Sequence, residues 1–149
     1  MSKQRVKRLQ FVLAMAEEKE KTDLKNWGIY QQKLLQEQEK LTQLDQYMAE
    51  YRSSLTSQQT VAIRGGQIQN TIAFIEQIKD ASGHQQQQIN LVEQQAEGAQ
   101  RVYLASRSKA QALRTLIEKL NSQLAATAEK QDQKLMDEFA ARSARNRSL

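Results

Sequence analysis

Apolar residues recur with a seven-residue period along the first part of the chain. One row comprises Leu13, Trp27, Leu34, Leu41, Met48 and Leu55, and the other comprises Leu9, Ala16, Tyr30, Leu44 and Tyr51. The rows are three and four residues apart, which is the spacing of the two core positions of a coiled coil. This pattern predicts a helix over about 3–56 whose apolar seam is interrupted by Glu20, Asp23 and Glu37.

A second and longer seam follows, and it predicts a helix over about 67–141. Its main row comprises Ile68, Ile75, Ile89, Ala96, Tyr103, Ala110, Ile117 and Leu124, and its companion row comprises Ile78, Val92, Ala99, Leu113 and Leu120. Near Ala128 the phase shifts to Leu135 and Phe139, which indicates a stutter or a different use of this end. Residues 142–149 form a basic tail.

The segment between the two seams has the composition of a turn. It contains hydroxyl and β-branched residues and the pair Gly65-Gly66, so we expect the chain to reverse at about 57–66. The chain has no proline and only five glycines, and little in it interrupts a helix. We therefore predict an all-α fold: a single domain, 1–149, formed by a long two-helix antiparallel coiled-coil hairpin in which the second helix is longer.

The two seams can be aligned, because facing residues of an antiparallel pair have numbers with a constant sum, here about 126. This register sets Trp27 near Ala99 and Leu9 near Ile117, and it sets Leu41 against Gln85, so the stretch around 82–84 should pack most loosely. Residues beyond about Ile117 then have no partner within the chain. An apolar stripe nevertheless continues there through Leu120, Leu124, Leu135, Met136 and Phe139, and an unpaired stripe predicts a binding partner.

Charge and composition narrow the classes of function. The net charge is +5, with Lys3, Arg5, Lys7 and Arg8 near one end and Arg142, Arg145 and Arg147 near the other. Such ends suit an acidic protein surface, nucleic acid or anionic lipid, and they also suit solvated tails. The acids Asp132, Asp137 and Glu138 close to the second cluster argue against nucleic acid. A self-associating coiled coil of two parallel chains remains an alternative.

We predict no enzymatic activity and no cofactor or metal. The chain has no cysteine, a single histidine, His84, and no glycine-rich phosphate loop. The apolar stretch from Leu9 to Ala16 is broken by Gln10 and followed by acids, so we expect neither a signal peptide nor a membrane span.

Aromatic residues on both sides of the turn are candidates for protein binding. Tyr47 and Tyr51 lie one helical turn apart, and Phe74 and Ile78 form a similar pair on the second helix. The register puts Tyr51 and Ile78 in the seam, whereas Tyr47 and Phe74 should be at least partly exposed. Exposed aromatics are effective interface anchors, although ordinary seam residues would have the same spacing.

Several segments in the same order resemble the flagellar export protein FliJ family. They are RVKRLQFVLAMAEEKEK, KLTQLDQYMAEYRSSL with Tyr47 and Tyr51, the segment containing Phe74, Ile75 and Ile78, and DQKLMDEFAARSAR. The most specific pieces are QYMAEYR and DQKLMDEF. The related stalk proteins of virulence type III secretion systems, or a generic coiled-coil adaptor, are the alternatives.

The resemblance implies a cytoplasmic, non-enzymatic component of the flagellar type III export apparatus, associated peripherally with the inner membrane. Its implied partners are the export ATPase FliI, a hexameric ring that the paired termini would enter, the export gate protein FlhA, and export chaperones. By position, the implied gate-binding tip comprises Leu44, Tyr47, Tyr51, Phe74, Ile78 and Ala81. The predicted contact with the ATPase ring comprises Arg5, Lys7, Arg8, Leu9, Leu124, Lys134, Leu135, Met136 and Phe139.

Overall fold

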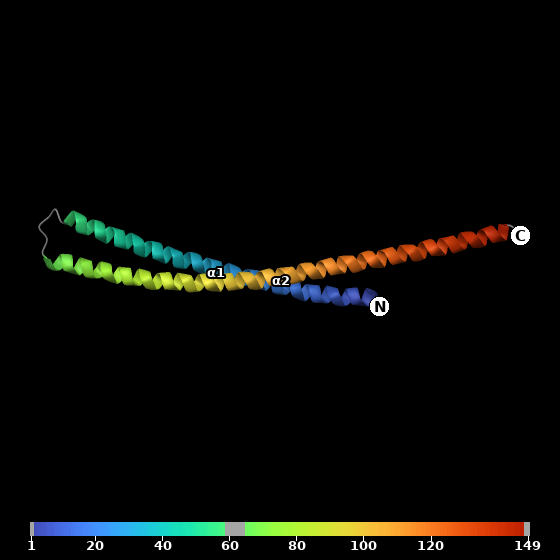
Figure 1. The fold of residues 1–149 in the computed structure, drawn as a ribbon, viewed down its shortest axis with the longest axis horizontal. Helices are drawn as coiled ribbons and strands as arrows, with labels where there is room; N and C mark the ends of the chain where they lie inside the picture. Colours follow the sequence, from blue (N-terminus) through green and yellow to red (C-terminus); the bar gives the residue numbers. More distant parts are fainter. Residues whose placement is uncertain (1, 59–64, 148–149) are drawn as a thin grey trace. The chain divides into compact units, whose positions relative to one another are not determined.

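Two helices account for the structure. The computed structural model describes residues 2–58 and 65–147, and all of these are helical (Figure 1). α1 comprises Ser2–Gln58 and α2 comprises Gly65–Arg147, with 57 and 83 residues. The predicted two-helix hairpin with a longer second helix is confirmed. Six residues of the expected turn, 59–64, lie outside the described residues.

The helix ends differ from the expected ones at both ends of α2. Gly65 and Gly66 lie in its first turn rather than before it, and no described glycine has a positive φ. At the other end, residues 142–147 continue the helix instead of forming a tail. Arg145 and Arg147 are in the last turn, where cations interact favourably with the helix dipole. The basic end of the chain is therefore displayed on a helix.

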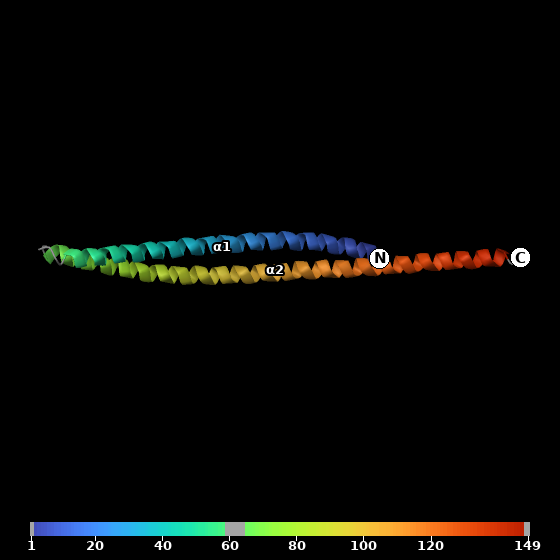
Figure 2. The same cartoon turned by 90° about the horizontal axis from the view of Figure 1, so that it is seen from above.

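The chain divides into two compact units, and each contains a segment of both helices. The first unit comprises residues 1–22 and 104–149, and the second comprises residues 23–103. Within each unit the α1 and α2 segments run side by side in opposite directions (Figure 2).

The core of the second unit is a single apolar seam. Ile75, Ile78, Ile89, Val92, Ala96 and Ala99 are buried on α2, and Val92 is fully buried. On α1 most of the predicted positions, among them Leu34, Leu41 and Met48, are half-buried, whereas Tyr51 is exposed. Trp27, expected near Ala99, also stacks on Tyr103 with 5.6 Å between the ring centroids. Burial is confined to one stripe per helix, so each unit offers much of its surface to solvent.

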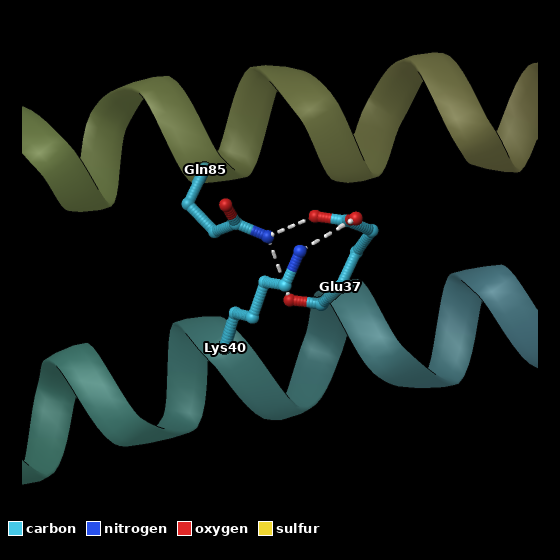
Figure 3. Close-up of polar contacts among 3 residues, drawn as sticks. All are labelled: Glu37, Lys40 and Gln85. Carbon is cyan, nitrogen blue, oxygen red and sulfur yellow. Dashed lines mark hydrogen bonds and ion pairs between the residues drawn. The ribbon is translucent and has the colours of Figure 1, made fainter.

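A polar layer interrupts the seam of the second unit (Figure 3). The Gln85 Nε2 donates to the Glu37 carboxylate at 2.6 Å and to the Glu37 backbone carbonyl at 2.9 Å. Lys40 Nζ lies 3.2 Å from the same carboxylate. The hydrogen bonds from Gln85 and Lys40 lower the pKa of Glu37 below its ordinary value of 4.5, against the opposing effect of burial.

The register explains why Gln85 reaches Glu37. The expected partner of Gln85 was Leu41, one turn along α1, and the extended amide side chain reaches the acid instead. One turn before it on α2, the buried Ser82 Oγ has no hydrogen-bond partner among the described residues. The seam near 82–85 is therefore polar, with one buried hydroxyl unsatisfied.

The first unit has a smaller core. Val6, Ala16, Ser106, Ala110 and Ile117 are buried. At its flank, Arg114 pairs with Glu17 at 3.2 Å and with Glu20 at 3.5 Å, and all three side chains are partly exposed. Lys19 Nζ also donates to Ser106 Oγ at 3.4 Å. Three of the five buried residues are thus alanine or serine, so this core contains less apolar material than that of the second unit.

Pairing extends farther than the register predicted. Val6 is buried, and Leu120 and Leu124 are half-buried, because α1 begins at Ser2 and so adds one more seam position before Leu9. Residues 125–142 are all exposed, and in this unit α2 extends past the start of α1 (Figure 2). The part of α2 that extends past the start of α1, residues 125–147, is called the overhang below.

Candidate protein-binding surfaces

The aromatic residues on either side of the turn form one cluster in the second unit. The rings of Tyr51 and Phe74 contact each other with their centroids 4.8 Å apart and their planes tilted by 58°. Tyr47, Glu50, Tyr51 and Ser54 line a shallow groove of about 280 Å³ beside them. Tyr47 is 54% exposed and Phe74 44% exposed, as expected. Residues of both helices thus contribute to this surface.

The other residues predicted for this tip are less accessible. Ala81 is exposed, Leu44 is half-buried, and Ile78 is buried. Tyr51, which the register placed in the seam, is 37% exposed because its ring turns outward onto Phe74. The accessible part of the predicted surface therefore consists of Tyr47, Tyr51, Phe74 and Ala81. Ile78 is buried and is not accessible to a partner.

Heptad geometry explains why three of these residues share a face. Tyr47, Phe74 and Ala81 each immediately precede a seam residue, which is the g position of a heptad. In an antiparallel pair the g positions of the two helices flank the same side of the seam. The fold thereby brings together residues from both helices without any loop.

The predicted contact at the other end falls mainly on the overhang. Leu135, Met136 and Phe139 are 63%, 72% and 74% exposed, and they project from one side of a single helix. Lys134 is also exposed, on another side of the helix, and Leu124 is half-buried where pairing ends. These three large apolar side chains have no covering element among the described residues, so they form an exposed apolar cluster and are a candidate contact for another protein.

The N-terminal residues of the predicted contact lie on α1 of the same unit. Arg5, Lys7 and Arg8 are exposed, and Leu9 is half-buried in the seam. The first turn of α1 contains no acid. This end of the unit is accordingly a basic surface, whereas Leu9 contributes to packing.

Sequence reasoning missed an apolar surface on α1. Phe11 is 69% exposed, Met15 61% and Val12 41%. Val12 and Met15, with Ala16, Lys19, Ser106 and Lys109, line a groove of about 390 Å³. The run FVLAMA was a signal for this surface, because it holds more large apolar residues than a seam of two per heptad requires.

The described residues offer no other obvious chemistry. In 2–58 and 65–147 no group of three or more His, Cys, Asp or Glu side chains is arranged to hold a metal ion. Neither helix, over its described length, contains a stretch long and apolar enough to cross a membrane.

Comparisons with known proteins agree on one family. The model of the family described as "Flagellar FliJ protein" matches residues 5–149. A protein of Escherichia coli (strain K12), also described as "Flagellar FliJ protein", is 32% identical over 109 residues, covering 73% of this chain and 74% of the relative. No solved structure matches significantly.

Proposed function

The chain belongs to the flagellar FliJ family and is a component of the flagellar export apparatus, and on this premise we propose that its overhang inserts into the ring of the export ATPase FliI. In this role the overhang is a central stalk that promotes assembly and activity of the ring. The family is a non-catalytic part of the apparatus, so the chemistry belongs to the ATPase.

The proposal rests on one observation: Leu135, Met136 and Phe139 are exposed on the part of α2 that extends past α1. A cluster of large apolar side chains in water is unfavourable unless a partner covers it. A single helix is also narrow, about 10–12 Å with its side chains, so a ring can surround it from all sides. Arg142, Arg145 and Arg147 at its end would orient it against acidic groups of the ring lining.

The aromatic tip of the second unit is the proposed contact with the export gate protein FlhA. Tyr47, Tyr51 and Phe74 form a partly exposed cluster supported by two packed helices. Such aromatic anchors bury a large area at a small cost in side-chain entropy. Partial exposure limits the affinity, which suits a contact that has to release in each cycle.

Coupling between the two surfaces is the mechanism we propose. Nucleotide-dependent states of the ring would bind the overhang with different affinities, and a ligand shifts an equilibrium only by such a difference. The tip would pass this bias to the gate at the cytoplasmic face of the inner membrane. Recycling of export chaperones, which the family resemblance also implies, belongs to the same proposal.

The first experiment compares the full chain with a truncation after Leu124 in ATPase and ring-assembly assays with purified FliI. We expect the full chain to stimulate hydrolysis and assembly, and the truncation to lose both. Circular dichroism should show that the truncated chain still unfolds cooperatively, because the buried residues all lie before residue 125. Full stimulation by the truncated protein would contradict the proposal.

Tyr47→Ala is the matched control for this experiment. Tyr47 is exposed and far from the overhang in sequence, so the variant should stimulate FliI normally. It should bind the cytoplasmic domain of FlhA less tightly, by about tenfold if Tyr47 is a binding hot spot. Equal binding by Tyr47→Ala and wild type would remove the tip from the gate contact while leaving the stalk proposal intact.

A further inference from the structure

The most exposed large apolar side chains of the described residues form two clusters in the first unit. Phe11 and Met15 are 69% and 61% exposed on α1, and Leu135, Met136 and Phe139 are 63–74% exposed on the overhang. All other exposed large apolar side chains described are at most 56% exposed. Within one unit, the chain therefore carries two unusually accessible apolar surfaces.

Met15 of the cluster on α1 lines a groove with a basic edge, whereas Phe11, one turn earlier, is not among the lining residues. Val12, Met15 and Ala16 form its apolar floor together with Ser106, and Lys19 and Lys109 line it from the two helices. Arg8 is exposed one helical turn before Val12. No acid is among the lining residues, so the groove suits a helix whose apolar face carries acids.

The overhang has such a face. Asp132 precedes Leu135 by three residues and Phe139 by seven, so it lies on their side of the helix. Glu129 precedes Met136 by seven residues and borders the same face. The helical period turns Lys130 and Lys134 to the opposite side. Between 129 and 139 the apolar face of the overhang therefore carries acids and no base, which complements the groove. Arg142, seven residues after Leu135, lies on the same side just beyond this stretch.

We propose that two copies of this chain associate, with the overhang of each copy lying in the groove of the other. The two α2 helices would run antiparallel, with Leu135 of one copy beside Lys109 of the second copy. Because both surfaces belong to one unit, a two-fold axis fills both grooves at once, which closes the assembly as a dimer.

The size of the contact fits a modest dimer. Four of the five most exposed apolar side chains of each copy, all except Phe11, would be covered, and a small specific interface buries roughly 1,200 Å² in total. The lysines and acids would fix the direction of the overhang in the groove and make association weaker at high salt. This inference uses the chain alone and does not rest on the role proposed for the ATPase ring. Because the dimer covers the overhang residues that the ring would contact, one copy cannot make both contacts at once, and the ring would have to displace the second copy.

Sedimentation velocity of the full purified chain at low salt tests the dimer. We expect a concentration-dependent monomer–dimer equilibrium that Phe139→Ser weakens by about tenfold or more. Ile29→Ser is the matched control, since Ile29 is 56% exposed in the second unit and should leave association unchanged. A wild type that is monomeric at every concentration, or equal weakening by both variants, would overturn the proposal.

Charge exchange and cross-linking test the pairing itself. Lys109→Glu should weaken association, and Lys109→Glu combined with Asp132→Lys should restore it. Because the chain has no cysteine, Met15→Cys and Met136→Cys can be mixed as separate proteins, and a disulfide should link one to the other. Failure of the double exchange to restore association, or cross-links of Met15→Cys only to itself, would exclude this arrangement.

Discussion

The two units contain the same irregularity, an acid at a seam position, and accommodate it differently. In the first unit Glu20 reaches outward to Arg114, and the side chains are 21% and 42% exposed. In the second unit the Glu37 side chain is only 10% exposed, and it receives hydrogen bonds from Gln85 across the seam and from Lys40 on its own helix.

This difference shows what an interrupted seam can contribute. An ion pair at a solvated flank adds little free energy and constrains alignment weakly. A buried carboxylate needs hydrogen-bond donors. Lys40 on the same helix supplies one in any register, so a register that adds Gln85 is favoured over one that does not. We infer that the first unit tolerates its acid, whereas the second uses its acid to select one alignment of the two helices.

Substitutions in the apolar seam, which both units contain, should have the largest effect on stability. Ile89→Ala in the second unit and Ile117→Ala in the first should each lower the free energy of unfolding by about 2–4 kcal/mol, because both side chains are buried. Urea denaturation measures this. Leu91→Ala is the control, at 49% exposure, and should change stability by less than about 0.5 kcal/mol. An Ile117→Ala variant as stable as the control would mean that the first unit does not depend on its seam.

Removing the amide of the polar layer should have the next largest effect. Gln85→Ala leaves the Glu37 carboxylate without its shortest hydrogen bond, so it should destabilise the chain less than Ile89→Ala but more than removal of the flank ion pair. Thermal unfolding ranks the three variants. Gln86→Ala is the control, because Gln86 is exposed and bonds only to Asn90 one turn away. If Gln85→Ala and Gln86→Ala unfold alike, the layer does not select the alignment.

Acid should weaken the second unit through Glu37. Its pKa is lowered in the folded chain, so the folded state holds the carboxylate more strongly than the unfolded state does. The resulting stability is fully present above the ordinary pKa of 4.5 and is lost as the pH falls through the lowered value. Unfolding measured from pH 6 downward should show this loss in wild type but not in Glu37→Gln. If the stability of wild type and of Glu37→Gln falls equally as the pH is lowered, Glu37 does not cause the loss.

The flank ion pair should give the smallest effect. Arg114→Ala should cost about 1 kcal/mol or less, since its partners Glu17 and Glu20 are partly solvated. The difference from wild type should shrink at about 1 M salt, where charges are screened within a few ångströms. Arg107→Ala is the matched control, because Arg107 is exposed and occupies the equivalent position one heptad earlier. If Arg114→Ala lowers stability strongly and the loss does not depend on salt, the first unit depends on its polar contacts as much as the second unit does.

Seam positions were predictable from the sequence because burial in a two-helix pair follows the heptad directly. Ile75, Ile89, Val92 and Ile117 are buried where the pattern placed them. The length of the pairing was less predictable, since Val6 extends it by one seam position and shortens the overhang accordingly.

Contacts made by long side chains escaped the sequence pattern. Gln85 reaches Glu37 rather than Leu41, and Tyr51 turns outward onto Phe74. A heptad assigns the direction of a Cβ, but the rotamer of a long side chain decides which neighbour, a turn away, it contacts. The same limit explains why Tyr51 was expected to be hidden.

Of the two exposed apolar surfaces of the first unit, the one on the overhang could be predicted from the sequence and the one on α1 was missed. The apolar residues of the overhang stood out because no facing seam was left for them. Phe11 and Met15 did not, since they lie within a segment that also supplies seam residues. Excess apolar residues beside a complete seam were the available signal.

The wide separation of paired residues along the chain has a consequence during synthesis. Glu37 and Gln85 are 48 residues apart, whereas Glu17 and Arg114 are 97 apart. At 5–20 residues per second, the ribosome needs roughly 5–20 s after making Glu17 to reach Arg114. The second unit can close earlier, while seam residues on the α1 segment of the first unit, such as Val6 and Leu9, remain uncovered until their α2 partners are made. During synthesis this α1 segment therefore needs protection from aggregation for longer than the α1 segment of the second unit.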